Sequence, residues 1–229
     1  MERTRNSPIR VADPVRRGER GGGGQGERRS PGGRGGARTG NPKGGRRTYP
    51  EGVSDYESGQ AMRVYVPLTL SGLAAAHRAG ELGPGPLTAY AVTPALREWY
   101  VSDDIEELEY AALSRAASAS LRMIAGDPAA TRRRVVVAVD VPDGDAVADP
   151  DHILDASSLG EVAIASAVAL AKAAAVHVDS DEADKDVTAA AAALGAADLG
   201  DGDAQFTVDG AEDHELLWFG IQEIPNLIG

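Results

Sequence analysis

Two short segments carry side chains that could do acid–base chemistry. In VHVDS, His177 and Asp179 are two residues apart, so on a strand their side chains would point to the same face. In DHELLW, His214 and Glu215 are neighbours in the chain. A histidine paired with a carboxylate can act as a general base, and these four residues are therefore the candidate catalytic residues.

Each candidate has a structural alternative. For His214 we favour an interpretation in which the ring is partly buried and hydrogen-bonded, and the aromatic residues that could surround it belong to the core. These aromatic residues are Trp99, Tyr100, Trp218 and Phe219. The competing interpretation keeps them beside an acid–base group formed by Asp213, His214 and Glu215.

Neither segment completes a catalytic or metal-binding pattern. A zinc motif of the form HExxH would need a second histidine where Trp218 stands. Ser180 follows the first pair without the glycines of a nucleophile elbow, and GxSxG occurs nowhere in the chain. An EF-hand starting at Asp201 and ending at Glu212 has Phe206 where the loop needs glycine. We therefore expect no bound metal.

Composition removes further chemistries. The chain has no cysteine, which excludes thiolate-bound zinc, iron–sulfur clusters and thiol nucleophiles. The glycine-rich loop GELGPGP follows a predicted helix, and Pro84 and Pro86 remove backbone donors that a phosphate loop would need. We therefore expect no cofactor.

Polar residues of the predicted helices could line a small-molecule pocket. They are Arg97, Glu98, Glu109, Tyr110 and Arg115. In the alternative that we favour, Arg97 and Glu98 pair with neighbouring charges on a solvated face. The acidic stretches 143–151 and 198–213 are read as solvated loops rather than as a cation site.

Alternating strand and helix patterns must position these side chains. The run VVVAVDV is typical of a strand buried on both faces, and we expect it to be the central strand. Segment 215–224 fits a strand, a helix or extended packing. The predicted strands are 63–68, 88–93, 133–141, 162–170 (a helix remains an alternative) and 174–179, and the predicted helices are 70–79, 94–99, 103–126 and 186–197. This order predicts a mixed α/β or α+β sheet with helices packed on it, in a single domain.

Several of these segments resemble a family of uncharacterised actinobacterial proteins. The resemblance covers residues 62–229 and none of residues 1–61. Members of this family begin at the residue that matches Met62, and no activity, substrate or catalytic residue is assigned to them. The segments that carry it are MRVYVPLTL, AYAVTPALREWY, EELEYAALSRAASASLRMIAGDP, RRRVVVAVDVPD, AAVHVD and AEDHELLWFGIQEIPNLI.

Residues 1–61 differ from the rest in composition. They contain 15 Gly, and 13 Lys and Arg against 7 Asp and Glu, whereas residues 62–229 contain 10 against 28, a net charge of −18. We predict a disordered Gly/Arg-rich tail, because so few apolar residues cannot offset the entropy of ordering. A second hypothesis is that Met62 is the true start, since translated GC-rich DNA would read as Gly, Arg, Pro and Ala.

These observations predict a cytoplasmic protein, since residues 1–61 hold no secretory signal and no tract is long enough for a membrane span. We expect a non-catalytic binding or protein-interaction module that binds an unknown protein partner or itself. The first alternative is a small enzyme with a His/acid pair. The second is RNA binding through the basic tail, and without the tail we expect no nucleic-acid partner.

Overall fold

The computed structural model describes residues 61–148 and 158–229. The predicted tail, apart from Ala61, and residues 149–157 of the predicted acidic loop lie outside this part of the chain.

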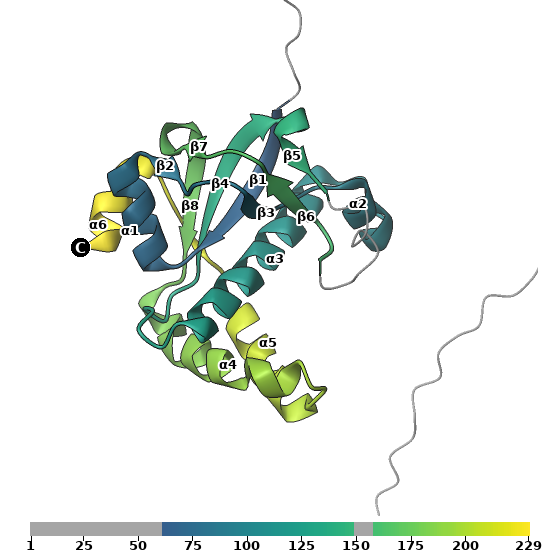
Figure 1. Cartoon of the computed structure of the whole chain (residues 1–229). Coiled ribbons are helices and arrows are strands. Elements are labelled where there is room, and N and C mark those ends of the chain that lie inside the picture. Colours follow the sequence, from purple (N-terminus) through teal and green to yellow (C-terminus); the bar gives the residue numbers. More distant parts are fainter. Residues whose placement is uncertain (1–60, 149–157) are drawn as a thin grey trace, which may run out of the picture. The chain divides into compact units, whose positions relative to one another are not determined.

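The described strands form a seven-stranded sheet and a small two-stranded sheet (Figure 1). The large sheet has the order β5-β6-β3-β1-β4-β8-β9, and all its pairings are antiparallel. Its strands are β1 (Ala61–Leu68), β3 (Leu87–Ala91), β4 (Val135–Pro142), β5 (Ala146–Val147), β6 (Glu161–Ile164), β8 (Ala173–Val178) and β9 (Leu217–Phe219). The small sheet pairs β2 (Glu81–Leu82) with β7 (Val168–Ala169).

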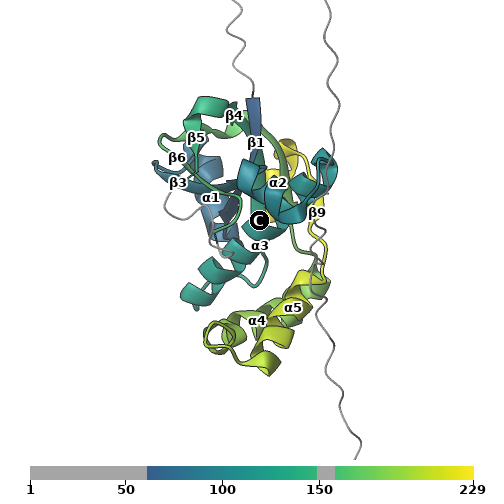
Figure 2. The same cartoon turned by 90° about the vertical axis from the view of Figure 1, so that its right-hand side faces the viewer.

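Helices pack on both faces of the large sheet. They are α1 (Leu70–Ala79), α2 (Pro94–Tyr100), α3 (Ile105–Gly126), α4 (Asp184–Ala197), α5 (Gly202–Glu212) and α6 (Ile224–Ile228). Helices α1 and α6 contact one face, and α2 and α3 contact the other. Figure 2 shows α4 and α5 packed together at the end of α3, away from the sheet.

Strand β4 shows why the sheet has two cores. Its odd-numbered valines, such as Val135 and Val137, pack on the face of α1 and α6. Its even-numbered Val136 and Ala138 pack on the face of α3, because successive side chains of a strand point to opposite faces. The apolar run Val135–Val139 of β4 is therefore buried on both sides.

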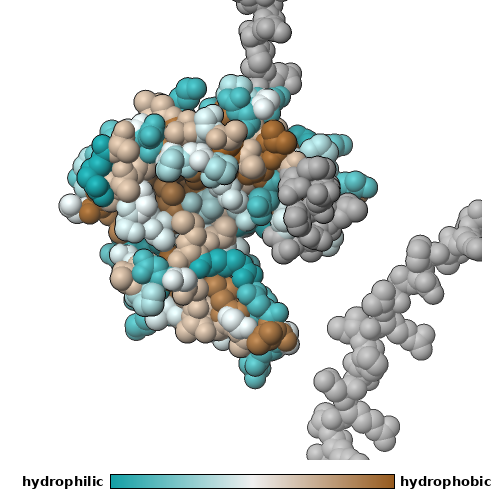
Figure 3. Space-filling model, viewed as in Figure 1, coloured by the Kyte–Doolittle hydropathy of each residue, from teal (hydrophilic) through white to brown (hydrophobic). Residues whose placement is uncertain are grey.

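One buried hydroxyl of α3 links the helix to two strands of the sheet, in addition to its apolar contacts. The Ser120 hydroxyl donates to the carbonyl of Leu68 at 2.6 Å and accepts from the backbone N–H of Val135 at 3.0 Å. Beyond this point the last turns of α3 pack against α4 and α5. Hydrophobic side chains remain exposed over the α4–α5 pair (Figure 3), where Leu199 and Phe206 are 90% and 79% exposed.

The structure confirms the expected sheet with helices packed on it, and its antiparallel pairings correspond to the α+β alternative. Three details differ from the sequence analysis. The segment 162–170, expected as one strand, is divided into β6 of the large sheet and β7 of the small sheet. The middle strand is β1, and the VVVAVDV run in β4 is its neighbour. The stretch 198–213, expected as an acidic loop, contains helix α5, because Asp201 caps its N-terminus and Ala204, Val208 and Ala211 form a buried stripe.

Candidate functional site

Arg134 and Asp179 form a buried ion pair at the base of the site. Arg134 directly precedes β4 and Asp179 directly follows β8, so the pairing of these strands brings them together. One carboxylate oxygen of Asp179 accepts from the backbone N–H and Nε of Arg134 at 2.7 and 2.9 Å. The other oxygen accepts from Nη2 at 2.7 Å. The two side chains are 2% and 0% exposed, and each buried charge is compensated by the other.

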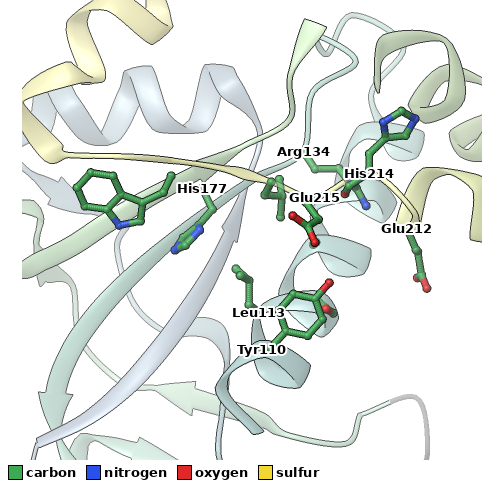
Figure 4. A pocket seen from close by; sticks show the side chains of 11 residues that line it. Tyr110, Leu113, Arg134, His177, Glu212, His214 and Glu215 are labelled. Atoms are coloured by element: carbon green, nitrogen blue, oxygen red, sulfur yellow. The ribbon is translucent and has the colours of Figure 1, made fainter. Parts of the chain in front are cut away.

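His214 is tied to this pair through its backbone. Its carbonyl oxygen accepts a hydrogen bond from Nη2 of Arg134 at 2.9 Å. Its ring nitrogen Nε2 lies 2.7 Å from a carboxylate oxygen of Asp186 in the first turn of α4. Figure 4 shows the His214 ring pointing away from Tyr110 and His177. His214 therefore connects the segment before β9 to α4.

A cavity of about 400 Å³ lies beside the ion pair, between α3, β8 and the segment that leads into β9. Helix α3 contributes Tyr110 and Leu113, and β8 contributes His177. Glu215 and Trp218 complete the wall from the C-terminal segment. Three parts of the chain that are far apart in sequence thus form one concave surface (Figure 4).

Among the residues that line the cavity, His177 has a pKa that its surroundings shift. Burial lowers the pKa of the His177 imidazole below its ordinary value, and the positive charge of Arg63 lowers it further. The ring is therefore uncharged at neutral pH. In the register of β8 and β9, His177 stands opposite Trp218, so their side chains lie on the same face of the sheet.

The charges left in the cavity are negative. Arg134 also lines it, but its guanidinium is paired with Asp179. Glu212 and Glu215 line the outer part and are exposed. The Ser118 hydroxyl donates a hydrogen bond to a carboxylate oxygen of Glu212 at 2.7 Å. The cavity therefore presents carboxylates beside two aromatic rings.

The structure distributes the four candidate catalytic residues over different environments. His177, His214 and Glu215 line the cavity, whereas Asp179 does not. The carboxylate of Asp179 binds Arg134 and the ring of His214 binds Asp186, so neither predicted pair is joined by a hydrogen bond within the described residues. A catalytic role for any of the four stays a prediction.

The expectation that the neighbouring aromatic residues belong to the core is wrong for three of them. Trp99, Tyr100 and Trp218 are 58%, 39% and 63% exposed. Trp99 and Tyr100 stand in the last turn of α2, and Trp218 lies on a strand at the end of the sheet. Phe219 is partly buried against the core on the α1 face, and His214 is partly buried and hydrogen-bonded as expected.

The polar residues Glu109, Tyr110 and Arg115 of α3 lie in different surroundings. Tyr110 lines the cavity, whereas Arg115 lines a second cavity of about 560 Å³ between α3, α5 and β3. Glu109 lies beside the buried Tyr65, where burial first and this carboxylate second raise the pKa of Tyr65 to about 12. These residues do not form one pocket.

Sequence reasoning missed the partners that organise the site. Asp186 holds the His214 ring from α4, and Arg134 holds Asp179 across two strands. Neither partner is a neighbour in sequence, so no local motif could have revealed the pairing. The exposed position of Tyr110, in contrast, follows from its place off the apolar stripe of α3.

Two searches of the described residues gave negative findings. No group of three or more His, Asp and Glu side chains in residues 61–148 and 158–229 could hold a metal ion. Within the same residues, no helix combines the length and the hydropathy needed to cross a membrane.

Comparison with known proteins agrees with the resemblance seen in the sequence. No curated protein and no solved structure gave a significant match. Residues 62–228, which include every residue of the cavity, match the profile of a family described as a family of unknown function, DUF6912. The chain therefore belongs to the DUF6912 family.

Proposed function

We propose that this domain is a non-catalytic binding module and that the cavity between α3, β8 and β9 binds a cationic group of its partner. The observation that carries the proposal is the combination of Tyr110 and Trp218 with the carboxylates of Glu212 and Glu215. Aromatic faces attract ammonium and guanidinium groups, and an adjacent carboxylate adds a charge-assisted hydrogen bond.

The other lining groups are compatible with a cation. The guanidinium of Arg134 is buried and paired, so its charge is compensated. His177 is uncharged at neutral pH, since burial lowers the pKa of its imidazole. The net charge of −18 over residues 62–229 also attracts a basic partner from a distance.

A small enzyme built on a His/acid pair is less well supported. In a His/acid pair the carboxylate orients the imidazole by a hydrogen bond to its ring nitrogen. Within the described residues the carboxylate of Asp179 is engaged by Arg134, and the His214 ring is held by Asp186 and points away from Tyr110 and His177. RNA binding through residues 1–61 lies outside the described part of the chain and stays a prediction.

The proposal is tested with an arginine derivative and its neutral isostere. The full chain, labelled with ¹⁵N, is titrated with acetyl-arginine methylamide and with acetyl-citrulline methylamide, which replaces the guanidinium by urea. The two tryptophans are Trp99 and Trp218, and Trp99→Phe assigns their indole N–H signals. We expect the Trp218 signal to shift with arginine, and binding of citrulline to be roughly tenfold weaker.

Matched variants locate the interaction. Glu215→Gln should weaken the arginine-dependent shift, because it removes a carboxylate from the cavity wall. Glu98→Gln, an exposed carboxylate on α2 outside the cavity lining, should leave it unchanged. Equal shifts with arginine and citrulline, or no shift of Trp218 with either compound, would refute the cationic ligand.

A further inference from the structure

Strand β9 ends the sheet on the side of the cavity. It pairs with β8 on one side, and no described strand pairs with its other side. An edge strand presents backbone N–H and C=O groups that can pair with another extended chain. Its outward side is therefore a place where a peptide could add a strand.

Apart from its short length, this edge lacks the features that usually prevent such pairing. Leu217, Trp218 and Phe219 include no charged residue and no proline, and their register with β8 shows no bulge. Leu217 and Trp218 are 47% and 63% exposed. The short length of β9, three residues, limits the addition to a short peptide segment.

The cavity lies on one face of the same strand. Trp218 lines it, whereas its neighbour Leu217 points to the opposite face because successive side chains of a strand alternate. A peptide strand added to β9 would place alternate side chains on the cavity face, next to Trp218 and Glu215. One backbone interaction and one side-chain interaction could thus be made by the same ligand.

Charge decides between a foreign peptide and a second copy of the chain. Two copies of a domain whose residues 62–229 carry a net charge of −18 repel each other, and a parallel pair of β9 strands would also align Asp213 and Glu215 with the same residues of the other copy. Like charges facing each other oppose such pairing. A peptide that carries arginine or lysine is attracted by the same carboxylates.

We propose that the partner is an extended basic segment of another protein, which adds a strand to β9 and places one cationic side chain in the cavity. This inference rests on the proposed function, since the cavity is the same site. It names the mode of binding as strand addition, in which backbone hydrogen bonds supply affinity and the cavity supplies specificity.

The test separates strand pairing from occupation of the cavity. The ¹⁵N-labelled full chain is titrated with the peptide acetyl-Thr-Val-Arg-Val-Thr-amide and with the same peptide N-methylated at both valines and at arginine. Methylation removes the three central backbone N–H donors, which point to both edges of the peptide, and keeps the guanidinium. We expect shifts of the backbone N–H signals of Leu217, Trp218 and Phe219, and binding roughly tenfold weaker or worse after methylation.

Each outcome has a distinct meaning. If both peptides bind equally and both need arginine, strand addition is overturned and the cationic cavity stands. If the unmethylated peptide binds but citrulline replaces arginine without loss, the edge pairs and the proposed function fails. Absence of binding to any peptide refutes strand addition. Sedimentation of the chain alone serves as the control, and a dimer broken by Leu217→Lys would assign the β9 edge to a second copy instead.

Discussion

The two faces of the large sheet differ in what they bury. The face under α1 and α6 buries an apolar cluster that includes Val64, Val66 and Val137. The face under α3 holds Tyr65 and Tyr90 together with the polar groups of the site. One face is therefore built for packing alone, and the other combines packing with polar contacts.

The difference follows from how completely each face is covered. Helices α1 and α6 contact each other and cover the apolar face. Helix α3 contacts β1, β3 and β4 and packs on α4 and α5 at its end, so β8 and β9 border the open cavity. Polar side chains are tolerated there because they reach a partner or water.

The largest effect should come from a charge on the apolar face. Val137 is fully buried in the apolar cluster under α1 and α6. Val137→Asp would place an unpaired carboxylate in that cluster. We expect loss of the folded state, measured by circular dichroism and by the soluble fraction. The control is Val147→Asp, because Val147 is 59% exposed and should tolerate the charge. A soluble, cooperatively melting Val137→Asp chain would contradict the assignment of this core.

The next effect concerns the buried ion pair on the α3 face. Asp179→Asn keeps the shape of the side chain but leaves the charge of Arg134 uncompensated. We expect a loss of about 3–5 kcal/mol in the free energy of unfolding, measured with urea. Asp198→Asn breaks the exposed pair with Arg122, which solvent screens, and should cost much less. Equal losses in the two variants would show that burial does not distinguish these pairs.

A smaller effect should appear as a dependence of stability on pH. Burial lowers the pKa of His177 in the folded chain, so the protonated ring is favoured in the unfolded chain. The contribution of His177 is complete above its unfolded pKa of about 6.5 and is lost as the pH falls through the lower folded value. The free energy of unfolding, measured with urea between pH 5 and 7.5, should therefore change less steeply with pH in His177→Gln than in the unmodified chain. An unchanged slope would place the ring in water.

The smallest effect on stability is expected at the rim of the cavity. Tyr110 is 58% exposed, so Tyr110→Ala should change the free energy of unfolding by less than about 0.5 kcal/mol. The same variant should weaken the shift of the Trp218 indole signal by acetyl-arginine methylamide. A large loss of stability would instead show that Tyr110 contributes to packing, which would contradict its assignment to the open rim of the cavity.

Local elements were predictable where the signals were local. The helix expected at 70–79 is α1, since the Thr69 side chain accepts from Gly72 N–H and Gly80 ends the helix at φ +75°. The strand expected at 162–170 is interrupted between β6 and β7. Helix α5 was missed because its acidic exposed residues outweighed the buried stripe that Asp201 caps.

The candidate site was predictable only in its parts. His177, Glu215, Tyr110 and Trp218 were all recognised as chemically notable, yet nothing in the sequence brought them to one cavity. Their contact depends on β9 pairing with β8 and on α3 crossing the same face. The aromatic residues were expected in the core because aromatic side chains usually gain from burial, whereas here α2 and β9 leave them uncovered.

By itself, the sequence determined the acidic charge, the chemistries that are excluded and most of the strands and helices, because composition and periodicity are local properties. Only the tertiary structure decided the strand order, the pairing of Arg134 with Asp179 and the cavity beside His177. These features join residues separated by tens of positions. They depend on which faces pack together, and such packing is a property of the whole fold.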